Sequence, residues 1–85
     1  MVIADVEEPA LEQAVNSLAR RGASISGVRA DVSRAADVEA LRDHALSAFG
    51  AVHVLCNNAG IATAGTVDGT RPEQWRWTLD VNLWG

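Results

Sequence analysis

The fold is decided by residues 51–60, which read Ala51-Val52-His53-Val54-Leu55-Cys56-Asn57-Asn58-Ala59-Gly60. An apolar, partly β-branched run stops here at two amides, an alanine and a glycine. This pattern predicts a buried parallel strand over Val52–Cys56 that ends at the rim of a sheet and passes into a loop. In open α/β sheets, ligands bind beyond the carboxyl ends of the strands. The Asn-Asn-Ala-Gly rim therefore indicates a place where a flat ligand comes close to the main chain.

Two strand–helix units precede this stretch. Met1–Asp5 is apolar up to a terminal carboxylate, which predicts a short buried strand. A helix then opens at Glu7-Glu8-Pro9 and closes at Gly22, because acids and proline favour the first turn and glycine favours the left-handed cap. Its apolar residues recur at helical spacing: Leu11, Ala14, Val15 and Leu18. A second, weaker strand is predicted over Ala23–Ala30.

Two further helices complete the pattern. Ser33 is expected to cap the second helix, which Gly50 ends. Its apolar stripe comprises Val38, Leu41, Ala45, Ala48 and Phe49. Thr70 and Glu73 form an expected capping box for a last helix that runs to the end of the chain. The order strand, helix, strand, helix, strand, helix predicts an α/β fold with a parallel sheet and right-handed crossovers.

Composition excludes several classes of function. A net charge of −4 over 85 residues indicates neither a nucleic-acid nor an anionic-membrane partner, and no apolar run is long enough to cross a bilayer. The one cysteine, Cys56, can form no internal disulfide and has no neighbouring ligands for a metal site. We expect it to be a buried strand thiol in a cytoplasmic protein. His44 and His53 are expected to be solvated and to have no catalytic role.

Three expected strand tips carry polar groups to one edge of the sheet: Asp5, Asp31-Val32 and Asn57–Gly60. In a complete dinucleotide-binding fold, the carboxylate at the tip of that fold's second strand binds the adenosine ribose. It also repels a 2′-phosphate, so its presence favours NAD over NADP. The Asp31 carboxylate and the Val32 N–H match the exocyclic amine and a ring nitrogen of adenine. The alternative is that each aspartate merely caps a helix or turn.

Together with Asp80-Val81-Asn82, these segments resemble the NAD-dependent members of the short-chain dehydrogenase/reductase family in order and spacing. The resemblance implies a Rossmann-type, doubly wound parallel sheet. This chain would hold three strands and three helices of it, without the first βα unit and the C-terminal half. The resemblance assigns cofactor binding to six residues: Asp5 would bind the ribose, Asp31 and Val32 would bind adenine, and the cofactor rim would be lined by Asn57, Ala59 and Gly60.

The resemblance gives the two remaining amides different roles. Asn58 would tie its strand end to the neighbouring strand, and Asn82 would belong to the catalytic tetrad. In that tetrad, the helix backbone beside the asparagine holds a water that links a lysine to the proton relay. On a helical wheel Asn82 falls on an apolar face, with Trp75, Leu79 and Leu83. A core amide that bonds the backbone is the alternative reading. A second apolar side carries Trp77, Val81 and Trp84, and we expect it to be a homo-oligomer contact or to be covered by further chain.

The chain contains no tyrosine, no lysine and no glycine-rich turn after its first strand. The family's chemistry uses a tyrosine as general acid and base beside a lysine. We therefore expect an internal fragment of an oxidoreductase that acts on a small-molecule alcohol or ketone, itself inactive and marginally stable. A missing central strand would leave a gap of about 10 Å between the first and third strands. The alternatives are a non-catalytic adenosine-binding module and a metal-binding receiver-like domain.

Overall fold

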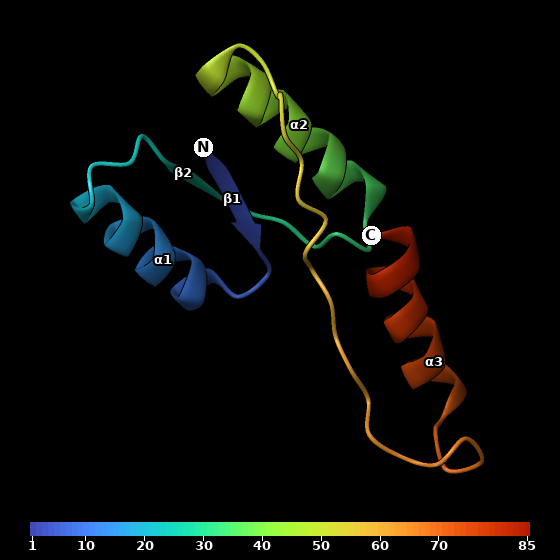
Figure 1. Cartoon of the computed structure of the whole chain (residues 1–85). Coiled ribbons are helices and arrows are strands. Elements are labelled where there is room, and N and C mark those ends of the chain that lie inside the picture. The colour runs from blue at the N-terminus through green and yellow to red at the C-terminus, as the bar shows by residue number, and fades with distance from the viewer.

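The N-terminal part of the chain is a β–α–β unit. The computed structural model describes residues 1–85. Strand β1 (Val2–Asp5) leads through helix α1 (Glu8–Arg20) to strand β2 (Ser26–Arg29), as Figure 1 shows. The strands pair in parallel, with Val2 opposite Ser26 and Asp5 opposite Arg29. The predicted strand–helix–parallel strand order is thus confirmed for this unit, although β2 is shorter than the predicted range of residues 23–30.

The α1 helix packs on this two-stranded sheet through its predicted apolar stripe. Leu11 is 7% exposed, and the approach to β2 is so close that a methyl group added at Gly27 would lie 2.7 Å from Val15 Cγ2. Glycine is therefore required here by space. Leu11 and Ala30 are the only buried residues of the chain, and neither is completely shielded from solvent, so the core is small.

Helix α2 (Ala35–Phe49) follows β2 and ends where the sequence predicts. Gly50 has a φ of 79°, the left-handed conformation expected of a C-cap glycine. At the other end, Arg34 occupies the N-cap position, so the prediction that Ser33 caps this helix is wrong. The Ser33 hydroxyl donates to the Asp31 carboxylate instead.

The prediction of two solvated histidines is wrong for His44. Its Nε2 lies 2.7 Å from Ser26 Oγ in a hydrogen bond that links α2 to β2, and the side chain is half-buried. Only His53 is exposed. A helix-to-strand contact of this kind depends on how α2 is placed over the sheet, which the sequence around His44 does not reveal.

The predicted third strand, Val52–Cys56, does not form. The sheet contains β1 and β2 alone, and residues 51–60 run as an extended segment without regular structure. A strand exists only against a partner edge, and no strand lies beside this segment to satisfy its backbone groups. Val54 and Leu55 are 80% and 75% exposed in consequence, and Cys56 is exposed rather than buried.

The last helix begins and continues differently from the prediction. Helix α3 (Pro72–Leu79) has Arg71 as N-cap; the Arg71 N–H donates to Gln74 Oε1 at 3.0 Å, so the expected Thr70–Glu73 capping box is absent. The helix then widens into a π-helix, η1 (Asp80–Trp84). None of the helices combines the length and apolar character that crossing a bilayer requires.

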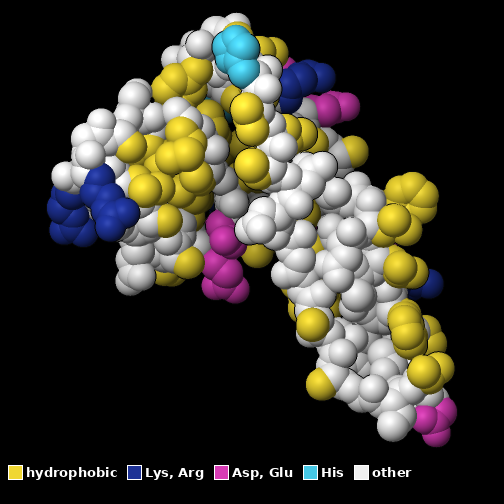
Figure 2. Space-filling view, in the orientation of Figure 1, with side chains coloured by type: hydrophobic (Ala, Val, Ile, Leu, Met, Phe, Trp, Pro, Cys, Tyr) yellow, Lys and Arg dark blue, Asp and Glu magenta, His cyan; other side chains and the backbone are white.

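The molecule is elongated. Its radius of gyration is 15.2 Å, whereas a compact chain of this length has about 12 Å. Figure 1 shows the β–α–β unit and α2 at one side, and α3 beyond the long connection. In Figure 2, hydrophobic side chains lie exposed both on the β–α–β body and along the arm that contains α3. The C-terminus returns to the start of α2, where a methyl group added at Gly85 would lie 2.7 Å from Val32 Cγ2.

Candidate functional site

The tips of β1 and β2 bring Asp5 and Asp31 to the same edge of the sheet, as predicted. Asp5 is the last residue of β1 and stands opposite Arg29, so Asp31 follows two residues beyond that pair. The Asp5 carbonyl accepts the Ala30 N–H at 3.1 Å, which joins the two tips. Asp5 Oδ1 accepts the Glu7 N–H at 2.9 Å, and its Oδ2 has no partner within the chain.

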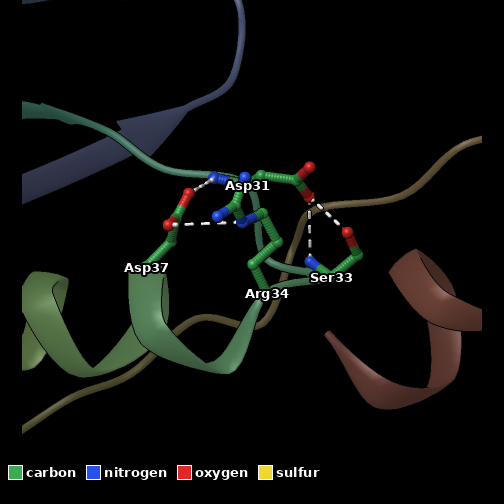
Figure 3. A network of polar contacts seen from close by, with 4 residues as sticks. All are labelled: Asp31, Ser33, Arg34 and Asp37. Atoms are coloured by element: carbon green, nitrogen blue, oxygen red, sulfur yellow. Dashed lines mark hydrogen bonds and ion pairs between the residues drawn. The ribbon is translucent and has the colours of Figure 1, made fainter.

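The Asp31 carboxylate is held by one neighbour, Ser33 (Figure 3). Its Oδ1 accepts the Ser33 hydroxyl at 2.6 Å and the Ser33 backbone N–H at 3.0 Å. The hydroxyl bond, followed by the backbone bond, lowers the pKa of Asp31 below its ordinary value. The carboxylate is therefore a firmly ionised acceptor at neutral pH.

The backbone beside this carboxylate is held by the first turn of α2. The Asp31 N–H donates to Asp37 Oδ2 at 3.0 Å, and Asp37 Oδ1 lies 3.7 Å from Arg34 Nε. The Arg34 N–H in turn donates to the Asp31 carbonyl at 2.9 Å. These contacts join the end of β2 to α2 in one hydrogen-bonded loop.

The same loop leaves one acceptor and one donor unpaired. Asp31 Oδ2 accepts no hydrogen bond from the chain, and the Val32 N–H donates none. A carboxylate oxygen and the next backbone N–H are the pair that the exocyclic amine and a ring nitrogen of adenine require. The turn thus leaves one acceptor of Asp31 and the Val32 N–H free, while Ser33 and Asp37 use the remaining groups of the loop.

The Asn57–Gly60 rim is extended and exposed. No side-chain hydrogen bond involves Asn58, so the expected tie between this amide and a neighbouring strand is absent from the structure. The rim is fixed one residue later, at Ile61. A methyl group added at Gly60 would lie 3.6 Å from Asn82 Oδ1, so the rim and η1 are close neighbours here.

Asn82 provides that attachment. Its Oδ1 accepts the Ile61 N–H and its Nδ2 donates to the Ile61 carbonyl, both at 2.8 Å. The amide thus bonds backbone, as the alternative reading of Asn82 proposed, but the residue is exposed and does not lie in the core that this reading expected. One donor and one acceptor of the side chain are engaged in this way, which fixes the orientation of the amide. Asn82 also lies within η1, and π-helical turns are rare and often found at functional sites.

Sequence reasoning missed Ser33 and Asp37 as parts of the site. The signals were present: a serine two residues after an aspartate commonly bonds it in a turn, and an acid at the third helical position bonds backbone groups ahead of the helix. No group of three or more His, Cys, Asp or Glu side chains is arranged to hold a metal ion.

Comparison with protein families gives a match over the whole chain. The model of a family described as short chain dehydrogenase matches residues 1–85. The chain is 35% identical over 83 residues to a CLA biosynthesis dehydrogenase/reductase of Lactiplantibacillus plantarum, and 38% identical over 79 residues to 3beta-hydroxysteroid dehydrogenase 1 of Eggerthella lenta. These alignments cover 98% and 93% of this chain but only 29% and 30% of the relatives. The chain therefore spans about a third of their length.

Solved structures show the same similarity. A short chain dehydrogenase/reductase from Burkholderia phymatum, in complex with NAD, matches with a TM-score of 0.95 and 47% identity over 98% of this chain. A gluconate 5-dehydrogenase from Burkholderia cenocepacia, in complex with NADP and tartrate, matches with a TM-score of 0.82 and 30% identity over 96% of this chain. The chain covers 30% and 32% of those two proteins. The arrangement of its elements is that of a Rossmann-type fold, of which it contains a part.

Proposed function

This chain belongs to the short-chain dehydrogenase family, and from that premise we propose that it forms the adenosine-binding edge of an NAD-dependent oxidoreductase. The observation that carries the proposal is the unpaired acceptor and donor at Asp31 Oδ2 and the Val32 N–H, beside Asp5. The complete activity is transfer of a hydride between a nicotinamide and the carbon of a small-molecule alcohol or ketone. Bound NAD would supply the hydride acceptor for that chemistry.

Asp5 favours NAD as the nucleotide. It is exposed at the tip of β1, and its unpaired Oδ2 is available to accept a ribose hydroxyl. A 2′-phosphate at the same place would bring negative charge against this carboxylate. We therefore propose that NADP binds more weakly than NAD.

The rim and η1 have supporting roles in the proposed site. Asn57, Ala59 and Gly60 line the cofactor, and Asn82 fixes the rim through its two bonds to Ile61. The catalytic role proposed for Asn82 comes from the family resemblance. In that role, the backbone of the widened turn around Asn82 holds a water of the proton relay. Its own amide is engaged with Ile61, so this role belongs to the position of the backbone.

Proton transfer needs residues that these 85 do not include. The chain has neither tyrosine nor lysine, so it offers no general acid of the family's kind. We propose that this segment alone binds nucleotide but does not catalyse. A non-catalytic adenosine-binding module is the second candidate function, favoured by the unpaired Asp31 Oδ2 and Val32 N–H on the adenosine side.

The exposed tryptophans suggest a protein partner. Trp77 and Trp84 are 53% and 77% exposed on α3 and η1. Aromatic side chains of this size are enriched at interfaces. We propose that this side forms a contact in a homo-oligomer.

We also propose a cytoplasmic location. The single unpaired thiol, Cys56, is compatible with it.

Calorimetric titration of the folded chain with AMP, NAD and NADP tests the proposal. We expect AMP and NAD to bind, with NADP weaker. Asp5→Asn should lower NAD affinity about fivefold and narrow the preference over NADP, because it removes one charged hydrogen-bond acceptor. Glu12→Gln, an exposed carboxylate on α1, is the matched control. A folded chain that binds none of the three nucleotides would overturn the proposal.

A further inference from the structure

The orientation of the Asp31 carboxylate is set by Ser33. A free aspartate can offer either oxygen, because its carboxylate turns about two side-chain bonds. Here Oδ1 is taken twice, by the Ser33 hydroxyl at 2.6 Å and by the Ser33 N–H at 3.0 Å. A distance of 2.6 Å is typical of a strong hydrogen bond to an ionised oxygen. Oδ2 is left as the one unpaired oxygen of the side chain.

The available backbone donor is set by Asp37. Its Oδ2 takes the Asp31 N–H at 3.0 Å, so that group cannot bond a ligand. The next N–H along the chain, that of Val32, has no partner. Removal of the Asp37 carboxylate would free this second donor one residue away and would release the end of β2 from the first turn of α2.

We propose that Ser33 and Asp37 are positioning residues that make the Asp31–Val32 pair selective for a 6-aminopurine over a 6-oxopurine. This inference rests on the proposed nucleotide-binding function. A 6-amino group donates a hydrogen bond to Asp31 Oδ2. The 6-oxo oxygen of hypoxanthine is an acceptor and would face Asp31 Oδ2, which is also an acceptor, so no hydrogen bond would form. A buried or fixed polar group left facing the wrong partner discriminates strongly, because its hydrogen bond is lost rather than exchanged.

The competing explanation is that both residues only stabilise local structure. Asp37 lies in the first turn of α2, where a negative charge favours the helix, and Ser33 closes a turn. Loss of local structure would weaken every purine nucleotide to the same extent. Loss of carboxylate orientation would weaken AMP far more than IMP. The ratio of AMP to IMP affinity therefore distinguishes the two explanations.

The experiment measures that ratio by calorimetry on the full 85-residue chain. Ser33→Ala removes the hydroxyl but keeps the backbone bond, and Ser33→Thr restores a hydroxyl. Asp37→Ala frees the Asp31 N–H, and Asp37→Asn restores an oxygen acceptor. Ser47→Ala and Asp43→Ala are matched controls at exposed positions of α2. Circular dichroism of each variant verifies the fold.

We expect each of Ser33→Ala and Asp37→Ala to lower the AMP-to-IMP ratio about fivefold. The two conservative variants and both controls should keep the ratio of the unaltered chain. If Asp37→Ala does not fold, the Ser33 pair of variants carries the test. An unchanged ratio in Ser33→Ala, in a chain that binds AMP, would overturn this inference and leave the proposed function intact. An unaltered chain that binds neither AMP nor NAD would overturn both.

Discussion

Asn82 and Ile61 exchange two hydrogen bonds of 2.8 Å, although they are 21 residues apart in the sequence. The Asn82 amide bonds both the N–H and the carbonyl of Ile61, as the backbone of a neighbouring strand would. These are the only side-chain hydrogen bonds that join residues 51–65 to another element. The rim therefore depends on one side chain of η1 for its position.

Asn82→Ala should release the rim. Loss of both bonds, each contributing about 1 kcal/mol, is expected to speed hydrogen exchange of the Ile61 amide at least fivefold. Exchange measured by NMR gives this directly. Asn16→Ala, an exposed amide on α1, should leave the Ile61 amide unchanged. Equal Ile61 exchange rates in Asn82→Ala and the unaltered chain would show that other contacts hold the rim.

Ser33→Ala should raise the pKa of Asp31 toward its ordinary value, because the Ser33 hydroxyl is the largest cause of the lowering. A carboxyl whose pKa is lower in the folded state stabilises the fold above its unfolded pKa. That contribution is lost as pH falls through the folded pKa. NMR titration of the Asp31 carboxyl carbon gives the shift, with Ser47→Ala as the control. An Asp31 pKa that is identical in Ser33→Ala and the unaltered chain would refute the assignment.

The sequence predicts those features of the molecule that depend on near neighbours. The apolar spacing of α1, the left-handed Gly50 and the aspartates at two strand tips are all as expected. Each is decided by residues a few positions away, through helix periodicity, cap geometry and strand alternation.

The failures concern distant partners. Val52–Cys56 has the composition of a strand but no edge to pair with, so it stays extended and exposed. His44 reads as a solvated helix residue because its partner, Ser26, lies 18 positions earlier. The sequence left two roles for Asn82 for the same reason, because its partner, Ile61, lies 21 positions earlier. Pairing across the fold is set by topology, which local pattern does not encode.

The His44–Ser26 bond should contribute to the docking of α2. At 2.7 Å and half-buried, it is expected to give a coupling free energy of about 0.5–1.5 kcal/mol. A double-mutant cycle of His44→Ala and Ser26→Ala, followed by urea unfolding, measures it. His53→Ala, which alters an exposed histidine, is the control for loss of an imidazole. Strictly additive effects in the cycle would mean that the bond adds nothing to stability.

Gly27→Ala should destabilise the β–α–β unit. The added methyl group would lie 2.7 Å from Val15 Cγ2 and 3.3 Å from Leu11, so these side chains or the helix that carries them must shift. Overpacking of this kind costs about 1–3 kcal/mol. Ser24→Ala, which alters an exposed side chain just before β2, should have little effect. Urea unfolding of both variants tests this, and equal midpoints for them would show that the helix adjusts freely.

Charge introduced at Val54 or Leu55 should make the isolated chain less prone to associate. Both side chains are largely exposed on a segment with unpaired backbone groups, which is the usual origin of strand-to-strand association. Neither contributes to the packing of α1 on the sheet, so Val54→Lys should change the free energy of unfolding by no more than about 0.5 kcal/mol. Sedimentation velocity should show fewer oligomers in this variant. Val15→Lys is the contrasting variant: it places a charge between α1 and the sheet and should unfold the β–α–β unit. If Val54→Lys associates as strongly as the unaltered chain, association proceeds through another surface, and the tryptophans of α3 and η1 are then the first residues to alter.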